Sequence, residues 1–223
     1  MSFLSESWGV VRKEIRVEGR QRVFAGSLGV FALATVMTVY FALAGRVPEP
    51  PVQAALVWVA MLFAASVGLG RTFVQEVETG TDVLLRLLVR PGAVYAGKLL
   101  FTLALTLGLG VVTVGAFLVV LGAEVAHPGL LALTVGLGGA GLAGTTTLLA
   151  ALVARARGGA ALLPVLLFPL LVPLLLSAVR LTRASLGGGL GWQGATDGLV
   201  TLGSFAVVVV AAAVLLFEHV WAE

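Results

Sequence analysis

Residues 99–121 read LLFTLALTLGLGVVTVGAFLVVL and contain no charged side chain. A helix that crosses about 30 Å of hydrocarbon needs roughly 20 mostly apolar residues, so this run is long enough to span a bilayer. It lacks the alternation of apolar and polar residues over about ten positions that marks a membrane β-strand. The run therefore predicts a transmembrane α-helix.

The rest of the chain repeats this pattern. Of the 223 residues, 59% are hydrophobic and 11% are charged, which is far from the composition of a soluble globular domain. Apolar runs bounded by charged, Gly or Pro positions occupy residues 24–44, 52–70, 99–121, 129–153, 160–179 and 199–217. We predict an all-α integral membrane protein that forms one transmembrane domain of six helices, with no room for a soluble catalytic domain.

The basic residues predict the orientation of these helices. With the N-terminus in the cytoplasm, eleven of the 14 basic residues fall on the inside, namely Arg12, Lys13, Arg16, Arg20, Arg22, Arg71, Arg86, Arg90, Lys98, Arg155 and Arg157. Arg46, Arg180 and Arg183 remain outside. Because cytoplasmic loops of membrane proteins are enriched in Lys and Arg, both termini are expected to be cytoplasmic. The net charge of +3 then reflects topology and does not indicate a nucleic-acid partner.

Residues 1–23, ahead of the first span, form an amphipathic stretch. Apolar or small residues recur at intervals of three and four, and basic residues fill the other face: Leu4, Trp8, Val11, Ile15 and Gly19 against Arg12, Lys13, Arg16 and Arg20. This pattern predicts a helix that lies flat on the inner leaflet. It leaves open whether the helix is a static anchor or moves during a transport cycle.

Two of the expected spans carry unusual residues. Pro164, Pro169 and Pro173 predict a bent or broken fifth span, because each proline removes a helical hydrogen bond. In the fourth span Gly136, Ala140 and Gly144 recur every four residues, with Gly141 and Thr145 beside them, which favours close helix packing. A subunit interface is the alternative explanation for that small-residue face.

The longest inner loop is residues 71–98, RTFVQEVETGTDVLLRLLVRPGAVYAGK. Gly80 permits a sharp turn, Thr81 or Asp82 can cap a helix, and Pro91 stops it. The resulting helix is too short to cross a bilayer, so its apolar residues, which include Leu84, Leu85 and Leu88, are expected to rest partly on the membrane and partly on a partner. Glu76, Glu78 and Asp82 could complement a basic partner, or could be solvated charges of an interfacial loop.

The sequence contains few groups that could perform chemistry. It has no Walker A loop, so ATP and Mg²⁺ are expected only in a partner chain, and the six predicted spans contain no Asp, Glu, Arg, Lys or His for a proton-driven carrier. There is no cysteine, and the two histidines have no neighbouring ligands. His127 in an outer loop is a candidate for contact with haem or a metal, with an ordinary surface histidine as the alternative. We therefore expect no catalytic residue, metal site or cofactor in this chain.

Several motifs together resemble one known family. W-V-A-x-L-x-A from Trp58 is followed by Arg71, Phe73, Glu76, Gly80, Leu84, Leu88, Pro91 and Gly97-Lys98, and residues 163–175 read LPVLLFPLLVPLL. This pattern resembles the CcmB family, the haem exporter B membrane subunit of cytochrome c maturation. The similarity covers essentially the whole chain and is most specific in the second span and the inner loop.

The resemblance implies an ABC transporter membrane subunit of the bacterial inner membrane with an ABC-2-type permease fold. It implies a homodimer paired with two copies of the ATPase CcmA, which would dock on a coupling helix near Glu76, Glu78, Gly80, Thr81, Asp82, Leu84, Leu85 and Leu88. Haem would be handled by the complex, with CcmC, CcmD and the periplasmic chaperone CcmE as further partners, and ATP hydrolysis would drive haem delivery or release of haem-loaded CcmE. An ABC-2 permease for another substrate and an ATP-independent scaffold are the alternatives.

Overall fold

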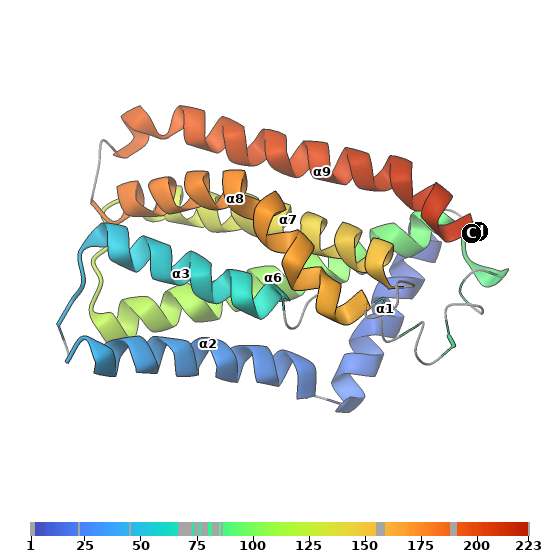
Figure 1. Ribbon diagram of the computed structural model, residues 1–223, viewed down its shortest axis with the longest axis horizontal. Helices are drawn as coiled ribbons and strands as arrows, with labels where there is room; N and C mark the ends of the chain where they lie inside the picture. Colours follow the sequence, from blue (N-terminus) through green and yellow to red (C-terminus); the bar gives the residue numbers. More distant parts are fainter. Residues whose placement is uncertain are drawn as a thin grey trace.

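The computed structural model describes residues 3–21, 23–44, 46–66, 73, 76, 80–81, 85, 87–154, 159–187 and 191–222, without the side chains of residues 20–21, 23–25, 159–161 and 218–222. All regular secondary structure in these ranges is helical. The elements are α1 (Phe3–Gln21), α2 (Val23–Ala42), α3 (Pro50–Ala64), α6 (Pro91–Leu121), α7 (Pro128–Val153), α8 (Gly159–Ser185), the 3₁₀ turn η2 (Gly191–Gly194) and α9 (Thr196–Ala222). Helices α2, α3 and α6–α9 run side by side along the molecule, and α1 crosses them at one end (Figure 1).

Four helices are long and apolar enough to cross a membrane: α6, α7, residues 162–185 of α8 and residues 196–217 of α9. Helices α2 and α3 are also apolar, but the parts of them with described side chains, Gly26–Ala42 and Pro50–Ala64, are shorter. The expectation of a helical membrane protein is therefore confirmed. The number of six spans remains a prediction, because four helices meet the length criterion in the described part of the chain.

The helices extend beyond several of the expected spans. Helix α6 starts at Pro91, which is a favoured first residue because its missing N–H would be unbonded there, and not at residue 99. Helix α8 continues past residue 179 to Ser185 with Arg180 and Arg183 exposed on its surface. A charged residue ends an apolar run but does not end a helix, and this difference explains the shifted boundaries.

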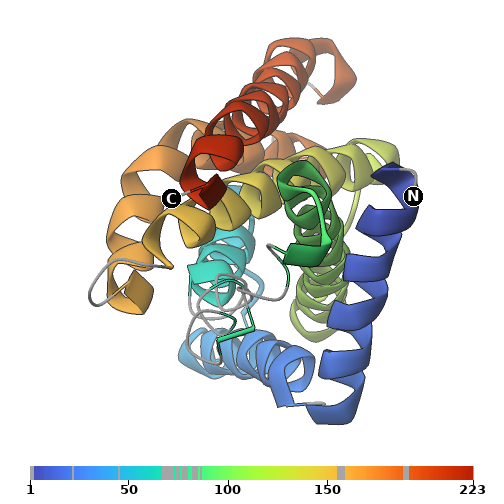
Figure 2. The same ribbon diagram turned by 90° about the vertical axis from the view of Figure 1, so that its right-hand side faces the viewer.

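Helix α7 is the central helix of the bundle. It buries a larger share of its apolar length than α6, α8 or α9, and Figure 2 shows it passing between α9 and α6. Close packing on its small residues is confirmed at Gly141, where a Cβ would overlap Leu174 of α8, and at Gly144, which faces Val209 of α9. Gly136 has open space around it, whereas Gly138, absent from the predicted row, lies against the edge of the Trp58 ring.

The three prolines bend α8 without breaking it. Pro164, Pro169 and Pro173 all lie inside one continuous helix, and Figure 1 shows this helix changing direction midway along its length. The expected bend is thus confirmed.

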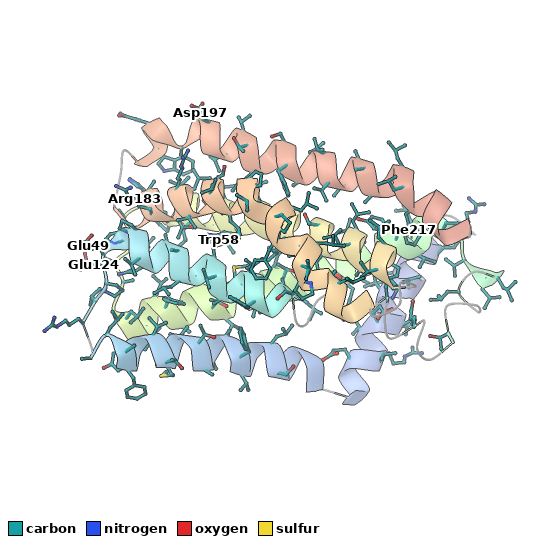
Figure 3. All side chains as sticks on the ribbon, in the orientation of Figure 1. Glu49, Trp58, Glu124, Arg183, Asp197 and Phe217 are labelled. Atoms are coloured by element: carbon teal, nitrogen blue, oxygen red, sulfur yellow. The ribbon has the colours of Figure 1, made fainter. Side chains whose placement is uncertain are left out.

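The connections sort into two groups at opposite ends of the bundle. Both chain ends and the connection between α3 and α6 lie at one end, which faces the viewer in Figure 2. The α2–α3, α6–α7 and α8–α9 connections lie at the other end, where Figure 3 labels the charged residues Glu49, Glu124, Arg183 and Asp197. We refer to these as the terminal end and the loop end. Of the basic residues predicted to be inside, Arg12, Lys13, Arg16, Arg90 and Lys98 belong to described elements at the terminal end, and five others lie outside the described residues.

Candidate functional site

The connection between α3 and α6 carries the predicted coupling residues. Its described residues are Phe73, Glu76, Gly80, Thr81, Leu85 and 87–90, whereas Glu78, Asp82 and Leu84 lie outside the described residues. Gly80 has a positive φ of 70°, so the sharp turn expected there is confirmed. We call residues 76–89 the connecting segment.

Backbone hydrogen bonds link this segment into a continuous path. The amide of Thr81 donates to the carbonyl of Glu76 at 3.0 Å, the amide of Leu85 to that of Thr81 at 3.3 Å, and the amide of Val89 to that of Leu85 at 3.0 Å. The last two bonds join residues four apart, as in an α-helix. Residues 85, 87 and 88 are helical, and α6 begins at Pro91, in agreement with the predicted short helix.

The short helix has an inward and an outward face. Leu85 and Val89 are partly buried and pack against the hydrophobic core. Leu87 and Leu88 are 77% and 78% exposed, which makes them two of the most exposed large apolar residues in the described chain. Neighbouring leucines that point away from the core indicate a contact with lipid or with another protein.

Glu76 lies in a buried cluster of four charges, with Lys13 and Glu14 of α1 and Lys98 of α6. The Lys98 ammonium is 2.9 Å from Glu76 Oε2 and 3.2 Å from Glu14 Oε1. The Lys13 ammonium contacts Glu14 Oε1 at 3.1 Å and also pairs with Glu76 Oε1. Each lysine therefore contacts both carboxylates, and we call this arrangement the charge ring.

The environment of the charge ring is largely dry. The side chain of Lys98 is 0% exposed and those of Glu14 and Glu76 are nearly buried, whereas Lys13 is partly open to solvent. Glu76 was expected to be a surface acid that complements a partner, but its carboxylate is engaged inside the chain. The sequence suggested a surface position because its two cationic partners come from α1 and α6, far away along the chain.

Burial and charge act in opposite directions on the ring. Burial alone would raise the pKa of Glu14, but Lys98 and then Lys13 more than offset this effect, so the pKa lies below its ordinary value of 4.5. Burial would lower the pKa of Lys13, but Glu14 and Glu76 raise it above its ordinary value of 10.5. Both groups therefore remain ionised through the neutral range.

Aromatic side chains line one side of the ring. Lys98 Nζ lies 4.6 Å from the centroid of Phe73, a cation–π geometry. The ring of Phe217, near the end of α9, is 5.7 Å from Phe73 and 5.1 Å from Tyr95 of α6 (Figure 3 labels Phe217 at this end). The site thus joins the N-terminal helix, the α3–α6 connection, α6 and α9.

Helix α1 docks on α6 through a glycine. A Cβ at Gly97 would come within 2.6 Å of Val10 Cβ and 2.8 Å of the carbonyl oxygen of Ser7, so the two helices approach as closely as their backbones allow. Val10 is buried here, while Trp8 is exposed on the far side. The predicted amphipathic helix is confirmed. One member of its predicted lipid face, Val11, is instead buried in the protein.

Comparison with protein-family models decides the identity. The CcmB model, described as CcmB protein, matches residues 5–220. This chain belongs to the CcmB family. A search of curated proteins gives no match. Membership makes the chain a membrane subunit of haem export in cytochrome c maturation, and the matched range includes α1 from its third residue onward, the connecting segment and all four residues of the charge ring.

At the loop end, the CcmB-family chain holds His127 between two connections. A Cβ at Gly191, whose φ is 58°, would overlap the His127 ring, and the His127 amide donates to the carbonyl of Ser185 at 2.9 Å. No group of three or more potential metal ligands occurs among the described residues. His127, at the end of the α6–α7 connection, therefore packs this connection against η2, and a contact with haem remains a prediction.

The sequence missed the role of α1 in this site. Ser7, Val10 and Glu14 follow each other at helical intervals of three and four, and all three are buried on the side of α1 that faces α6. These three residues are a weak sequence signal for a buried face, because a serine and a glutamate at such intervals also fit a helix face that is exposed to solvent. The pair Gly97-Lys98 contributed to the family resemblance, but nothing in the sequence connected it with α1.

The pKa directions predict how pH affects the docking of α1. Glu14 stabilises the docking of α1 fully above pH 4.5, and this stabilisation is lost as pH falls through its lowered pKa in the folded chain. Lys13 stabilises the docking fully below pH 10.5, and this stabilisation is lost as pH rises through its raised pKa. A spin label at Trp8→Cys should keep a constant mobility between these limits and become more mobile beyond each. A label at Val119→Cys, exposed on α6, is the control. A transition near pH 7 would contradict the assignment.

The close contact at Gly97 predicts a second effect on α1. Gly97→Leu forces the side chain into Val10 and the Ser7 backbone, and overpacking of this kind destabilises by about 1–3 kcal/mol. We expect α1 to detach, observed as increased mobility of a spin label at Trp8→Cys. Gly108→Leu on the same helix is the matched control, because nothing lies within 4 Å of a Cβ there. Equal effects of the two leucines would rule out the docking role of Gly97.

Proposed function

We propose that this chain couples ATP hydrolysis by two copies of the partner ATPase CcmA to haem delivery, or to release of the haem-loaded chaperone CcmE, in the bacterial inner membrane. The observation that supports this proposal best is the exposed pair Leu87 and Leu88 on a short helix at the terminal end. The proposal places that end in the cytoplasm, in line with the predominance of basic residues assigned to it.

The short helix has the properties of a docking element. Its outward leucines provide an apolar surface of the kind that a hydrophobic groove on a partner accepts. Its inward residues Leu85 and Val89 attach it to the core, so a force on the leucines is transmitted to the bundle. The connecting segment ends two residues before α6, the longest candidate span, which gives the force a direct route into the membrane.

The proposal assigns transmission of motion to this chain and the handling of haem to its partners CcmC, CcmD and CcmE. A cavity near the loop end, lined by Gln53, Phe117 and Thr182 among others, has a volume of about 10 Å³. That volume matches a single water molecule, so this cavity is far too small for haem. The proposal further includes a homodimer, as in other two-subunit ABC transporters with six spans per half.

Removal of the exposed leucines provides the test. Leu87→Gln with Leu88→Gln should reduce co-purification of the ATPase at least tenfold, because the contact loses its apolar anchors while the inward face of the helix is unchanged. Val47→Gln with Val52→Gln, two exposed apolar residues near the loop end, is the matched control. Undiminished association of the Leu87/Leu88 variant, with normal yield and folding, would overturn the docking assignment.

Two alternatives are separated by the same purification from native membranes. An ATPase that co-purifies with the chain together with CcmC or CcmE supports cytochrome c maturation. An ATPase that co-purifies without any haem-handling chain favours an ABC-2 permease for another substrate. A haem-handling complex that contains no ATPase favours an ATP-independent scaffold.

A further inference from the structure

The charge ring joins three parts of the chain that are far apart in sequence. Lys13 and Glu14 belong to α1, Glu76 to the connecting segment, and Lys98 to the start of α6. Positive and negative charges alternate around the ring, since each of the four contacts is between a lysine and a glutamate. The ring has no net charge.

Burial makes the ring difficult to open at a single contact. If Glu76 were to leave without its partners, the fully buried ammonium of Lys98 would lose one of the two carboxylates that contact it among the described residues. An uncompensated buried charge is strongly unfavourable, whereas a surface ion pair breaks at little cost. The connecting segment and α1 are therefore both expected to stay attached to α6.

Two further attachments strengthen this connection. The Gly97 contact holds α1 against α6 beside the ring, and Phe73 lies between Lys98 and Phe217 of α9. The hydrogen bonds from Glu76 through Thr81 and Leu85 to Val89 connect the ring to the exposed leucines. A displacement of Leu87 and Leu88 is thus carried to Glu76 through the backbone.

We propose that the charge ring locks α1, the connecting segment and the start of α6 into one unit that moves together when the nucleotide state of the ATPase changes. The movement rests on the proposed function, because the ATPase would drive it. The lock, meaning the fixed attachment of α1 and the connecting segment to α6, is a property of this chain alone. Helix α1 then follows the connecting segment and is not a static anchor. Glu76 and Lys98 act as positioning residues for coupling.

Distances between spin labels test the inference, and the cysteine-free chain is a suitable background for them. Labels replace the exposed residues Trp8 on α1, Thr81 in the connecting segment and Val47 near the loop end. In the complete complex with its ATPase, trapping with ATP and vanadate should shift the 8–47 and 81–47 distances and leave the 8–81 distance unchanged. A nucleotide-dependent 8–81 distance would overturn the lock, and fixed distances in all three pairs would overturn the movement.

Charge inversion tests the ring itself without the ATPase. Inversion of all four residues, Lys13→Glu, Glu14→Lys, Glu76→Lys and Lys98→Glu, preserves the alternation and should retain a narrow 8–81 distribution. The matched control, Glu14→Lys with Lys98→Glu, also keeps the net charge at zero but places like charges together at two of the four contacts, and should broaden the distribution. Equal distributions in the two variants would overturn the ring.

The measurements with and without the ATPase distinguish a failure of the inference from a failure of the proposed function. Failure of the ATPase to associate with the unaltered chain would contradict the proposed function, and the distribution without ATPase would still decide the lock. If all inverted variants fail to fold, the pair 8–81 in the chain with its natural ring decides the lock, because that measurement requires no change to the four charges.

Discussion

Replacement of Lys98 by methionine is expected to lower the free energy of unfolding by about 3–5 kcal/mol, the range found when one partner of a buried ion pair is removed. The methionine keeps most of the apolar stem, so the loss comes from the nearly buried carboxylates of Glu14 and Glu76, which are left with the partly exposed Lys13 as their remaining cation in the ring. Unfolding by SDS in mixed micelles, followed by circular dichroism, measures the effect.

Lys13→Met is the matched control for this substitution. Lys13 contacts the same two carboxylates, but 36% of its side chain is exposed, so solvent screens them when the ammonium is removed. We expect a clearly smaller loss than for Lys98→Met. Equal losses would show that burial does not determine the strength of the ring, and a negligible loss for Lys98→Met would show that its charge is not needed for the fold.

Trp58→Ala is expected to destabilise the bundle by about 3–5 kcal/mol, the usual result of truncating a buried aromatic residue. The Trp58 side chain is 1% exposed, lies against Gly138 of α7 and donates from Nε1 to Thr182 Oγ1 of α8 at 2.9 Å. Truncation opens a cavity where α3, α7 and α8 meet and leaves the Thr182 hydroxyl without this donor. The same SDS unfolding assay measures the loss.

Two variants identify the source of this effect. Trp8→Ala removes the same side chain from an exposed position on α1 and should change stability by less than about 0.5 kcal/mol. Trp58→Phe retains much of the packing but removes the indole donor, and should lower stability by about 1 kcal/mol plus the effect of the lost volume. A loss for Trp8→Ala as large as that for Trp58→Ala would contradict the importance of the buried contact.

Local patterns in the sequence predicted local structure well. The amphipathic α1, the turn at Gly80 and the bend of α8 all follow from residues that are close together in the chain, and each is present. The family resemblance, read from the second span and the inner loop, agrees with the family match over residues 5–220. Spacing and residue type are sufficient where a feature depends on neighbours within one or two helical turns.

Long-range pairings were not predictable in the same way. Lys98 was interpreted as a residue of the inner loop because a lone charge beside an apolar run normally marks its end. Its buried position depends on Glu14 and Glu76, which only the fold brings to it. Likewise Gly138 must be a glycine because the Trp58 ring of another helix lies against it. Nothing in the sequence spacing of α7 distinguishes Gly138 from Gly136, which has open space around it.

Among the predicted coupling residues, too, local structure was predicted correctly and long-range contacts were not. Leu85 and Leu88 lie on a short helix as expected, with Leu85 against the core and Leu88 exposed. The described residues of the face that would meet an ATPase, Leu87 and Leu88, are apolar, and Glu76, the described member of the acidic set, is used inside the chain. Contact of this helix with CcmA remains a prediction that the glutamine variants address.

The alternating charges of the ring have an electrical consequence. A single charge that moves through the whole membrane field experiences about 2.3 kcal/mol per 100 mV, so a displaced lone lysine would make the motion depend on the membrane potential. Two lysines and two glutamates that move together transfer no net charge. The ring would therefore add no electrical work to a shift of the proposed unit at the membrane boundary, and the membrane potential would act only on the other charges of that unit, such as Arg12 and Arg16 of α1.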